Sequence, residues 1–127
     1  MRFIHIADIH LGYQQYNLPA RFEDFGLAFE RAVQYGIEHH AGAILIAGDL
    51  FNKATLEPLA FIQATDILGQ ARQAGIPVIA VEGNHDQARW RDQVSWMQVL
   101  AHEGYLARLT HDPKEEGLSF TPWDGSQ

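Results

Sequence analysis

Three short apolar runs divide this 127-residue chain, and their spacing limits its possible folds more than any other feature. Each run has the length of a β-strand, is rich in large or β-branched residues, and is followed at once by polar residues or glycine. The predicted strands are Phe3–Ala7, Ala43–Ala47 and Pro77–Val81. The segments between them are long enough to hold a helix, which favours a parallel sheet with helical crossovers over a sheet built from hairpins.

Apolar residues recur at helical spacing between these strands. The first helix is predicted from Phe22, Phe25, Phe29, Val33 and Ile37. The second is predicted from Leu59, Ile62, Ile67, Leu68 and Ala71, and it ends before Gly75-Ile76-Pro77. A third helix is predicted from Asp92 to Glu103, with further strands at Tyr105–Leu109 and Leu118–Thr121. This alternation predicts an α/β fold with a mostly parallel sheet and right-handed crossovers.

Composition limits the class of protein less sharply. The absence of cysteine excludes disulfides and thiolate metal sites. No apolar stretch is long enough for a membrane span or a secretion signal, so we expect a cytoplasmic protein without a membrane partner. The net charge of −7 argues against broad attraction to nucleic acid, but carboxylates gathered around metal ions would also make the chain acidic. The charge therefore does not decide between partners.

A polar motif follows each of the three predicted strands. The motifs are Asp8-Ile9-His10, Gly48-Asp49-Leu50-Phe51-Asn52 and Gly83-Asn84-His85-Asp86. Because the carboxyl ends of parallel strands meet at one edge of a sheet, we expect these motifs to lie together. Gly48 and Gly83 would let the backbone turn sharply and approach a ligand closely.

The residue types in these motifs suit a pair of metal ions. Asp8 and His10 are two residues apart, so in an extended chain both side chains point the same way and can bind one ion. Asp49 can bridge two cations through its two oxygens, and Asn84 offers a neutral carbonyl oxygen. Each motif alone is more often a turn or a cap, but all three in this order indicate a site for Mn²⁺, Fe²⁺ or Zn²⁺. A pair of such ions about 3.5–4 Å apart can activate water for phosphoryl transfer.

Together the three motifs resemble the N-terminal motifs of the calcineurin-like metallophosphoesterases. The longer segments Ile6–Tyr13, Ala47–Phe51 and Val81–Asp86 resemble the SbcD-type nuclease subunit of double-strand-break repair complexes, and the similarity covers residues 1 to about 107. The resemblance implies a sandwich of two β-sheets flanked by helices. Residues 1–127 would then be a truncated N-terminal part of the nuclease domain.

The resemblance also implies roles for individual residues. Asp8 and His10 would bind the first metal, Asp49 would bridge both, and Asn84 would bind the second. His85 would face the scissile phosphate, as an acid to the leaving oxygen or as a cationic stabiliser. The implied activity is DNA exonuclease and endonuclease cleavage with two Mn²⁺ ions, in complex with an SbcC-type SMC-like ATPase.

The sequence departs from the family pattern in two ways. Relatives often carry a second phosphate-facing histidine where this chain has Asn52, and an amide cannot protonate near neutral pH, so the balance of exonuclease to endonuclease activity stays open. The three later histidines that complete the family's metal site have no counterpart here. With four of seven expected ligands, residues 1–127 alone are expected to bind Mn²⁺ weakly and to cleave little DNA.

Two other functions remain open on the same residues. One is a phosphatase or a cyclic-nucleotide phosphodiesterase, and the other is a catalytically incomplete module for dimerisation or interaction. The second and third helices carry more apolar residues than one core-facing stripe needs, which predicts a two-fold homodimer unless the third helix is buried within the fold. The residues behind this prediction are Leu59, Ile62, Trp96, Val99 and Leu100.

Overall fold

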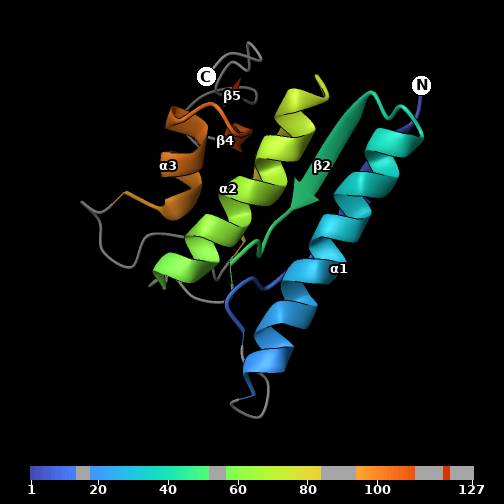
Figure 1. Cartoon of the computed structure of the whole chain (residues 1–127). Helices are drawn as coiled ribbons and strands as arrows, with labels where there is room; N and C mark the ends of the chain where they lie inside the picture. The colour runs from blue at the N-terminus through green and yellow to red at the C-terminus, as the bar shows by residue number, and fades with distance from the viewer. Residues whose placement is uncertain (14–17, 52–56, 84–93, 111–118, 121–127) are drawn as a thin grey trace.

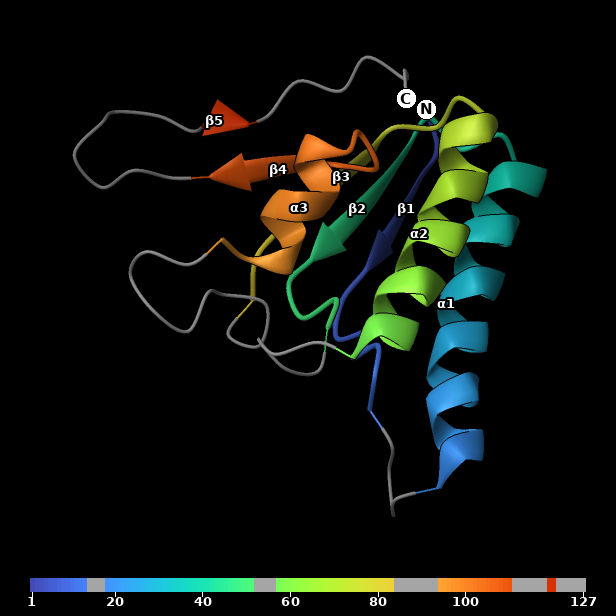
Figure 2. The ribbon, with the colours of Figure 1, turned by 60° about the vertical axis from the view of Figure 1, so that its left-hand side comes forward.

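A computed structural model describes residues 1–13, 18–51, 57–83, 94–110 and 119–120. Within these ranges the chain forms one β-sheet with helices packed on it (Figures 1 and 2). Its strands are β1 (Phe3–Ile6), β2 (Ala43–Ala47), β3 (Val78–Val81), β4 (Ala107–Thr110) and β5 (Ser119–Phe120). They lie side by side in sequence order; the first four are parallel, and β5 pairs with β4 in the antiparallel direction.

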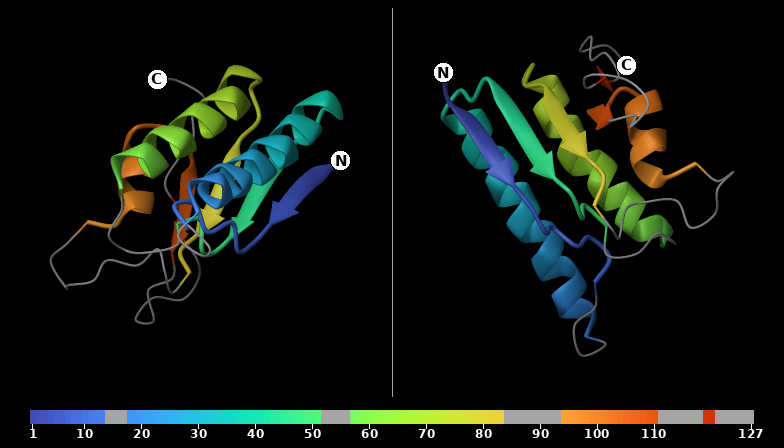
Figure 3. Two further views of the ribbon diagram at one scale, coloured as in Figure 1. Left: turned by 60° about the horizontal axis from the view of Figure 1, so that its bottom comes forward. Right: turned by 180° about the vertical axis from the view of Figure 1, so that it is seen from behind.

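The three helices cover one face of this sheet. Helix α1 (Pro19–Glu38) packs against β1 and α2, helix α2 (Pro58–Gln73) against β3, and helix α3 (Trp96–His102) against β4. Right-handed crossovers between strands in sequence order put every helix on the same side, as the views from below and behind make clear (Figure 3). The predicted α/β fold with a mostly parallel sheet is confirmed. None of the helices in the described ranges has the length and apolarity needed to cross a membrane.

The strand register builds the core beneath these helices. It aligns apolar side chains in two rows across the helix-covered face of the sheet. One row is Ile4, Ile44 and Val78, and the next is Ile6, Ile46 and Ala80. Large buried side chains from the helices and loops fill the space above them, including Phe29, Val33, Leu68, Met97 and Leu100. Burial of each such side chain contributes about 1.5–3 kcal/mol, so the core holds the strand ends in place.

The opposite face of the sheet is apolar except for the exposed His5 on β1, and none of the described elements covers it. Leu45 and Ile79 are register partners there, and both are half-buried. Phe3 lies on the same face of the edge strand β1 and is 56% exposed. The second sheet that the family resemblance implies is therefore not among the described residues.

Helix α3 is shorter than the sequence predicted. It begins at Trp96 because Ser95 caps it: the Ser95 hydroxyl accepts a hydrogen bond from the Gln98 backbone N–H, 3.2 Å away. The Gln98 side-chain oxygen in turn accepts one from the Ser95 N–H, 2.7 Å away. This reciprocal capping box stabilises a helix start by about 1 kcal/mol and fixes it at one residue. Val94 is not helical, and residues 92 and 93 lie outside the described ranges.

The same helix corrects the expected dimer surface. Leu100 is fully buried beside Met97 in the core, so its predicted place at a surface is wrong. Trp96 is also partly buried against the core. Leu59 and Ile62 on α2 are, by contrast, 69% and 51% exposed. The apolar character of α3 therefore reflects packing within one chain, and only α2 leaves large apolar side chains on the surface among the residues compared.

Candidate metal centre

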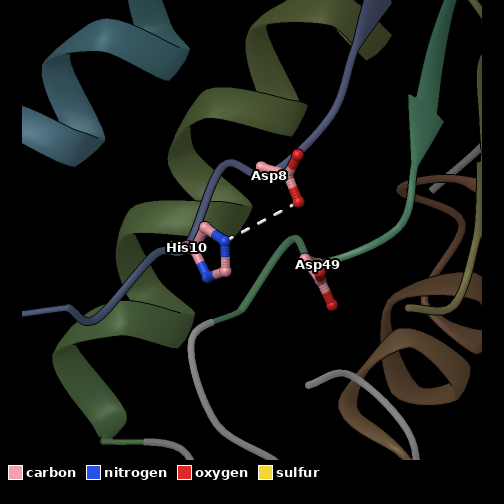
Figure 4. Close-up of side chains that lie close together, drawn as sticks. All are labelled: Asp8, His10 and Asp49. Atoms are coloured by element: carbon pink, nitrogen blue, oxygen red, sulfur yellow. Dashed lines mark ion pairs between the residues drawn. The ribbon is translucent and has the colours of Figure 1, made fainter. Parts of the chain in front are cut away.

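The three polar motifs begin where neighbouring strands of the sheet end. Asp8 and His10 follow β1, Asp49 follows β2, and Gly83 follows β3. Since these strands are parallel and adjacent, their carboxyl ends bring Asp8, His10, Asp49 and Gly83 to one edge of the sheet, as predicted. Figure 4 shows Asp8 and His10 of the first loop close to Asp49 of the second.

Backbone hydrogen bonds and buried side chains hold the first two loops together. The His10 N–H donates to the Asp49 carbonyl at 2.9 Å, and the Leu11 N–H donates to the Leu50 carbonyl at 2.8 Å. Leu11 and Phe51 then form a parallel bridge, so pairing resumes after the loops. Leu11, Leu50 and Phe51 are each at most 1% exposed. The apolar residues that follow the motifs therefore anchor the loops in the core.

Three residues of this cluster have left-handed backbone conformations. The φ angles are 54° at Asp8, 53° at His10 and 52° at Asp49. The extended chain predicted for Asp8 and His10 is therefore wrong, and the two side chains come together because the backbone turns at each of them. A left-handed residue other than glycine costs on the order of 1 kcal/mol, although Asp tolerates it better than most. Three such residues at one site indicate that the surrounding structure holds both loops in a strained conformation.

The side chains offer two carboxylates and one imidazole to a single point. One potential ligand atom from each of Asp8, His10 and Asp49 lies within 4.8 Å of the other two. Nε2 of His10 is 3.8 Å from Oδ1 of Asp8. Asp8 is mostly exposed, with 73% of its side chain accessible, while the His10 side chain is 24% exposed. Two carboxylates this close repel each other unless a cation lies between them, so the donor set fits a divalent metal ion.

Two glycines allow the second and third loops to touch. Gly48 has a φ of +81°, and a Cβ added to it would lie 3.1 Å from the Cα of Gly83. A Cβ added to Gly83 would lie 2.5 Å from the backbone nitrogen of Asp49 and 2.7 Å from its Cγ. Gly83 has no room for a side chain, and at Gly48 both the tight contact and the positive φ disfavour one. The sequence predicted that these glycines let the backbone approach a ligand closely. In the structure they let two loops of the protein approach each other, which brings the end of β3 against Asp49.

The remaining predicted site residues fall outside the described ranges. Asn84 and His85 come directly after Gly83 in the chain, and Asn52 comes directly after Phe51. Their predicted roles stay predictions. Within the described residues, Asp8, His10 and Asp49 form the one group of three acidic or histidine side chains close enough to share an ion.

A polar cluster behind the site was not singled out from the sequence. Oε1 of Glu82 accepts a hydrogen bond from the Ser95 hydroxyl and another, at 3.3 Å, from Nη1 of Arg108. The side chains of Glu82 and Arg108 are 17% and 21% exposed. The signal in the sequence is a charged residue at the end of a buried strand, directly before the Gly83 motif, because a carboxylate there needs partners.

Comparison with known proteins agrees with this geometry. A family model described as calcineurin-like phosphoesterase matches residues 1–126. The chain is 48% identical over 106 residues to a DNA double-strand break repair protein Mre11 of Archaeoglobus fulgidus, covering 84% of this chain and 24% of that protein. A protein of the same name from Haloferax volcanii is 37% identical over 116 residues, covering 91% of this chain and 26% of the relative. One from Aeropyrum pernix is 39% identical over 110 residues, covering 85% and 27%. The chain spans about a quarter of the length of these relatives.

Proposed function

The chain belongs to the calcineurin-like phosphoesterase family, and we propose that it supplies part of the active site of a DNA repair nuclease that hydrolyses phosphodiester bonds with two divalent metal ions. The observation that carries this proposal is the convergence of Asp8, His10 and Asp49, whose potential ligand atoms lie within 4.8 Å of one another. The relatives are named for DNA double-strand break repair, which supports DNA as the substrate.

Members of this family use divalent metal ions, and the mixed carboxylate and imidazole ligands are compatible with Mn²⁺, the ion that we propose for this enzyme. Asp8 and His10 would hold one ion, Asp49 would bridge to a second, and Asn84 would bind that second ion. When bound, such a pair activates water and neutralises charge on the phosphoryl oxygens. His85 would donate a proton to the leaving oxygen or stabilise the negative charge that develops on it.

We also propose that residues 1–127 form the N-terminal part of a larger nuclease domain. The chain spans about a quarter of the length of its relatives, and the sheet face with Phe3, Leu45 and Ile79, which is apolar except for His5, would suit a second layer. A second layer would remove these side chains from water, as the core does on the helix-covered face. Further metal ligands would then come from other parts of the domain.

The proposed nuclease acts in the cytoplasm with DNA and an SbcC-type SMC-like ATPase, and it forms a homodimer. Support for the dimer comes from Leu59 and Ile62 on α2, which are 69% and 51% exposed. A two-fold axis would pair the same patch of both copies and bury these side chains. The relatives' names, which refer to DNA double-strand break repair, support DNA as a partner, and the ATPase is proposed from the family resemblance.

The function is tested on the full-length protein with linear double-stranded DNA and Mn²⁺. We expect cleavage that stops when a chelator removes the metal and that is lost in Asp49→Asn, because the bridging oxygens lose their charge. Parallel assays with a phosphomonoester and a cyclic nucleotide test the phosphatase and phosphodiesterase alternatives. A protein that binds Mn²⁺ but prefers either of those substrates would refute the nuclease, and one that cleaves none of them would be an interaction module.

A further inference from the structure

We infer that Glu82 is a positioning residue for the proposed metal centre, which it serves by fixing the end of β3 against Asp49. The inference rests on the proposed function, since it assumes that Asp49 binds metal. Glu82 itself lies in the cluster behind the site and acts through Gly83.

The contacts of Glu82 join three elements at one carboxylate oxygen. Oε1 accepts hydrogen bonds from the Ser95 hydroxyl at the start of α3 and from Nη1 of Arg108 on β4, the latter at 3.3 Å. Ser95 is only 3% exposed, and the Glu82 side chain is 17% exposed. Hydrogen bonds to a charged group in such partly buried surroundings are stronger than neutral ones on the surface. They hold the last residue before the third loop in place.

A displacement of Glu82 would reach Asp49 through the backbone of Gly83. Gly83 follows Glu82, and the backbone nitrogen of Asp49 lies 2.5 Å from where a Cβ of Gly83 would be. The carbonyl carbon of Glu82 and the Cα of Gly83 also lie 4.0 Å and 3.1 Å from where a Cβ of Gly48 would be. The backbone at Glu82 and Gly83 is in close contact with that at Gly48 and Asp49. A shift of Glu82 would therefore displace the Asp49 loop. Residues that support metal ligands in this way affect metal affinity without touching the ion.

Packing alone does not explain a carboxylate at this position. Glu82 follows Val78 and Ala80, which are buried and apolar, along the helix-covered face of the sheet, and Arg108 is the register partner of Ala80 on this face. The capping of α3 does not need it, because Ser95 and Gln98 already satisfy each other. A partly buried charge costs desolvation energy that an apolar residue would avoid. Arg108 offsets part of this cost, and the proposed role accounts for the position of the pair directly before the Gly83 contact.

The test compares two substitutions that damage the same helix cap in the full-length protein. Ser95→Ala removes the bond to Glu82, whereas Gln98→Ala weakens the capping box but keeps that bond. We expect Ser95→Ala to weaken Mn²⁺ binding about 10–100-fold, and Gln98→Ala to leave it within about twofold. Both should lower the melting temperature of the metal-free protein. Titration calorimetry with Mn²⁺ alone and thermal denaturation in a chelator give the two readouts.

Substitution of Glu82 itself supplies the second arm. Glu82→Ala should lower Mn²⁺ affinity by about 10–100-fold, and Glu82→Gln, which keeps an acceptor oxygen, should restore most of it. If Ser95→Ala and Gln98→Ala weaken Mn²⁺ binding equally, or if Glu82→Ala lowers only the melting temperature, the role is structural and the inference is overturned. DNA cleavage by the wild-type protein is measured separately. A wild type that binds Mn²⁺ without cutting DNA refutes the nuclease and leaves the ratios of Mn²⁺ affinity to decide the inference.

Discussion

Replacing Gly83 with alanine should disturb the metal centre by steric overlap alone. The added Cβ would lie 2.5 Å from the backbone nitrogen of Asp49, whereas ordinary contact begins at 3.4 Å, so it needs about 0.9 Å more room. A backbone atom cannot rotate away as a flexible side chain can. We therefore expect the metal-free protein to lose about 1–3 kcal/mol of unfolding free energy, as other overpacked sites do. Displacement of Asp49 should also weaken Mn²⁺ binding about 10–100-fold.

Gly69→Ala is the matched control for this substitution. Gly69 lies within α2, and a Cβ there would meet Cε1 of Tyr105 at 3.9 Å, which is ordinary van der Waals contact. Because alanine is a better helix former than glycine, this change should stabilise the protein by about 0.5–1 kcal/mol. Denaturation in guanidinium chloride with a chelator measures both variants, and calorimetry measures their Mn²⁺ affinity. If the free energy of unfolding and the Mn²⁺ affinity of Gly83→Ala equal those of the wild type, Gly83 and Asp49 are not in close contact.

Three further predictions concern the backbone, the dimer and the proposed acid. Asp8→Val should lower the free energy of unfolding of the metal-free protein by about 1–2 kcal/mol in thermal denaturation, although Asp8 is exposed, because a β-branched residue disfavours a φ of 54°. Asp8→Asn should lower it little, and equal stabilities of the two variants would refute the backbone strain. Leu100→Asp should unfold the protein because Leu100 is fully buried, whereas Leu59→Asp should give a folded monomer in light scattering. A folded Leu100→Asp variant, or a Leu59→Asp variant that still dimerises, would contradict this prediction. His85→Gln should keep metal content, measured by elemental analysis, while DNA cleavage falls roughly 10²–10⁴-fold; an empty site would instead make His85 a ligand.

Much of the fold was predictable because the strands and helices carry strong local signals. β2 was predicted with its observed bounds, Ala43–Ala47, and β1 and β3 each differ from the prediction by one residue. These short apolar runs pack between helices and neighbouring strands, so their composition alone marks them. The end of the third helix was also close to its prediction, but its start was wrong because the Ser95 capping box outweighed the apolar pattern before it.

Sequence by itself therefore determined which residue types follow which strand, and so which edge of the sheet carries Asp8, His10 and Asp49. Only the tertiary structure decided how these side chains meet, because left-handed backbone at each residue depends on hydrogen bonds and packing between loops that are distant in the chain. It also decided that Leu100 is internal and that Glu82 joins three elements. An apolar or charged residue type shows a need for burial or for a partner, but the partner is chosen by contacts that local sequence does not contain.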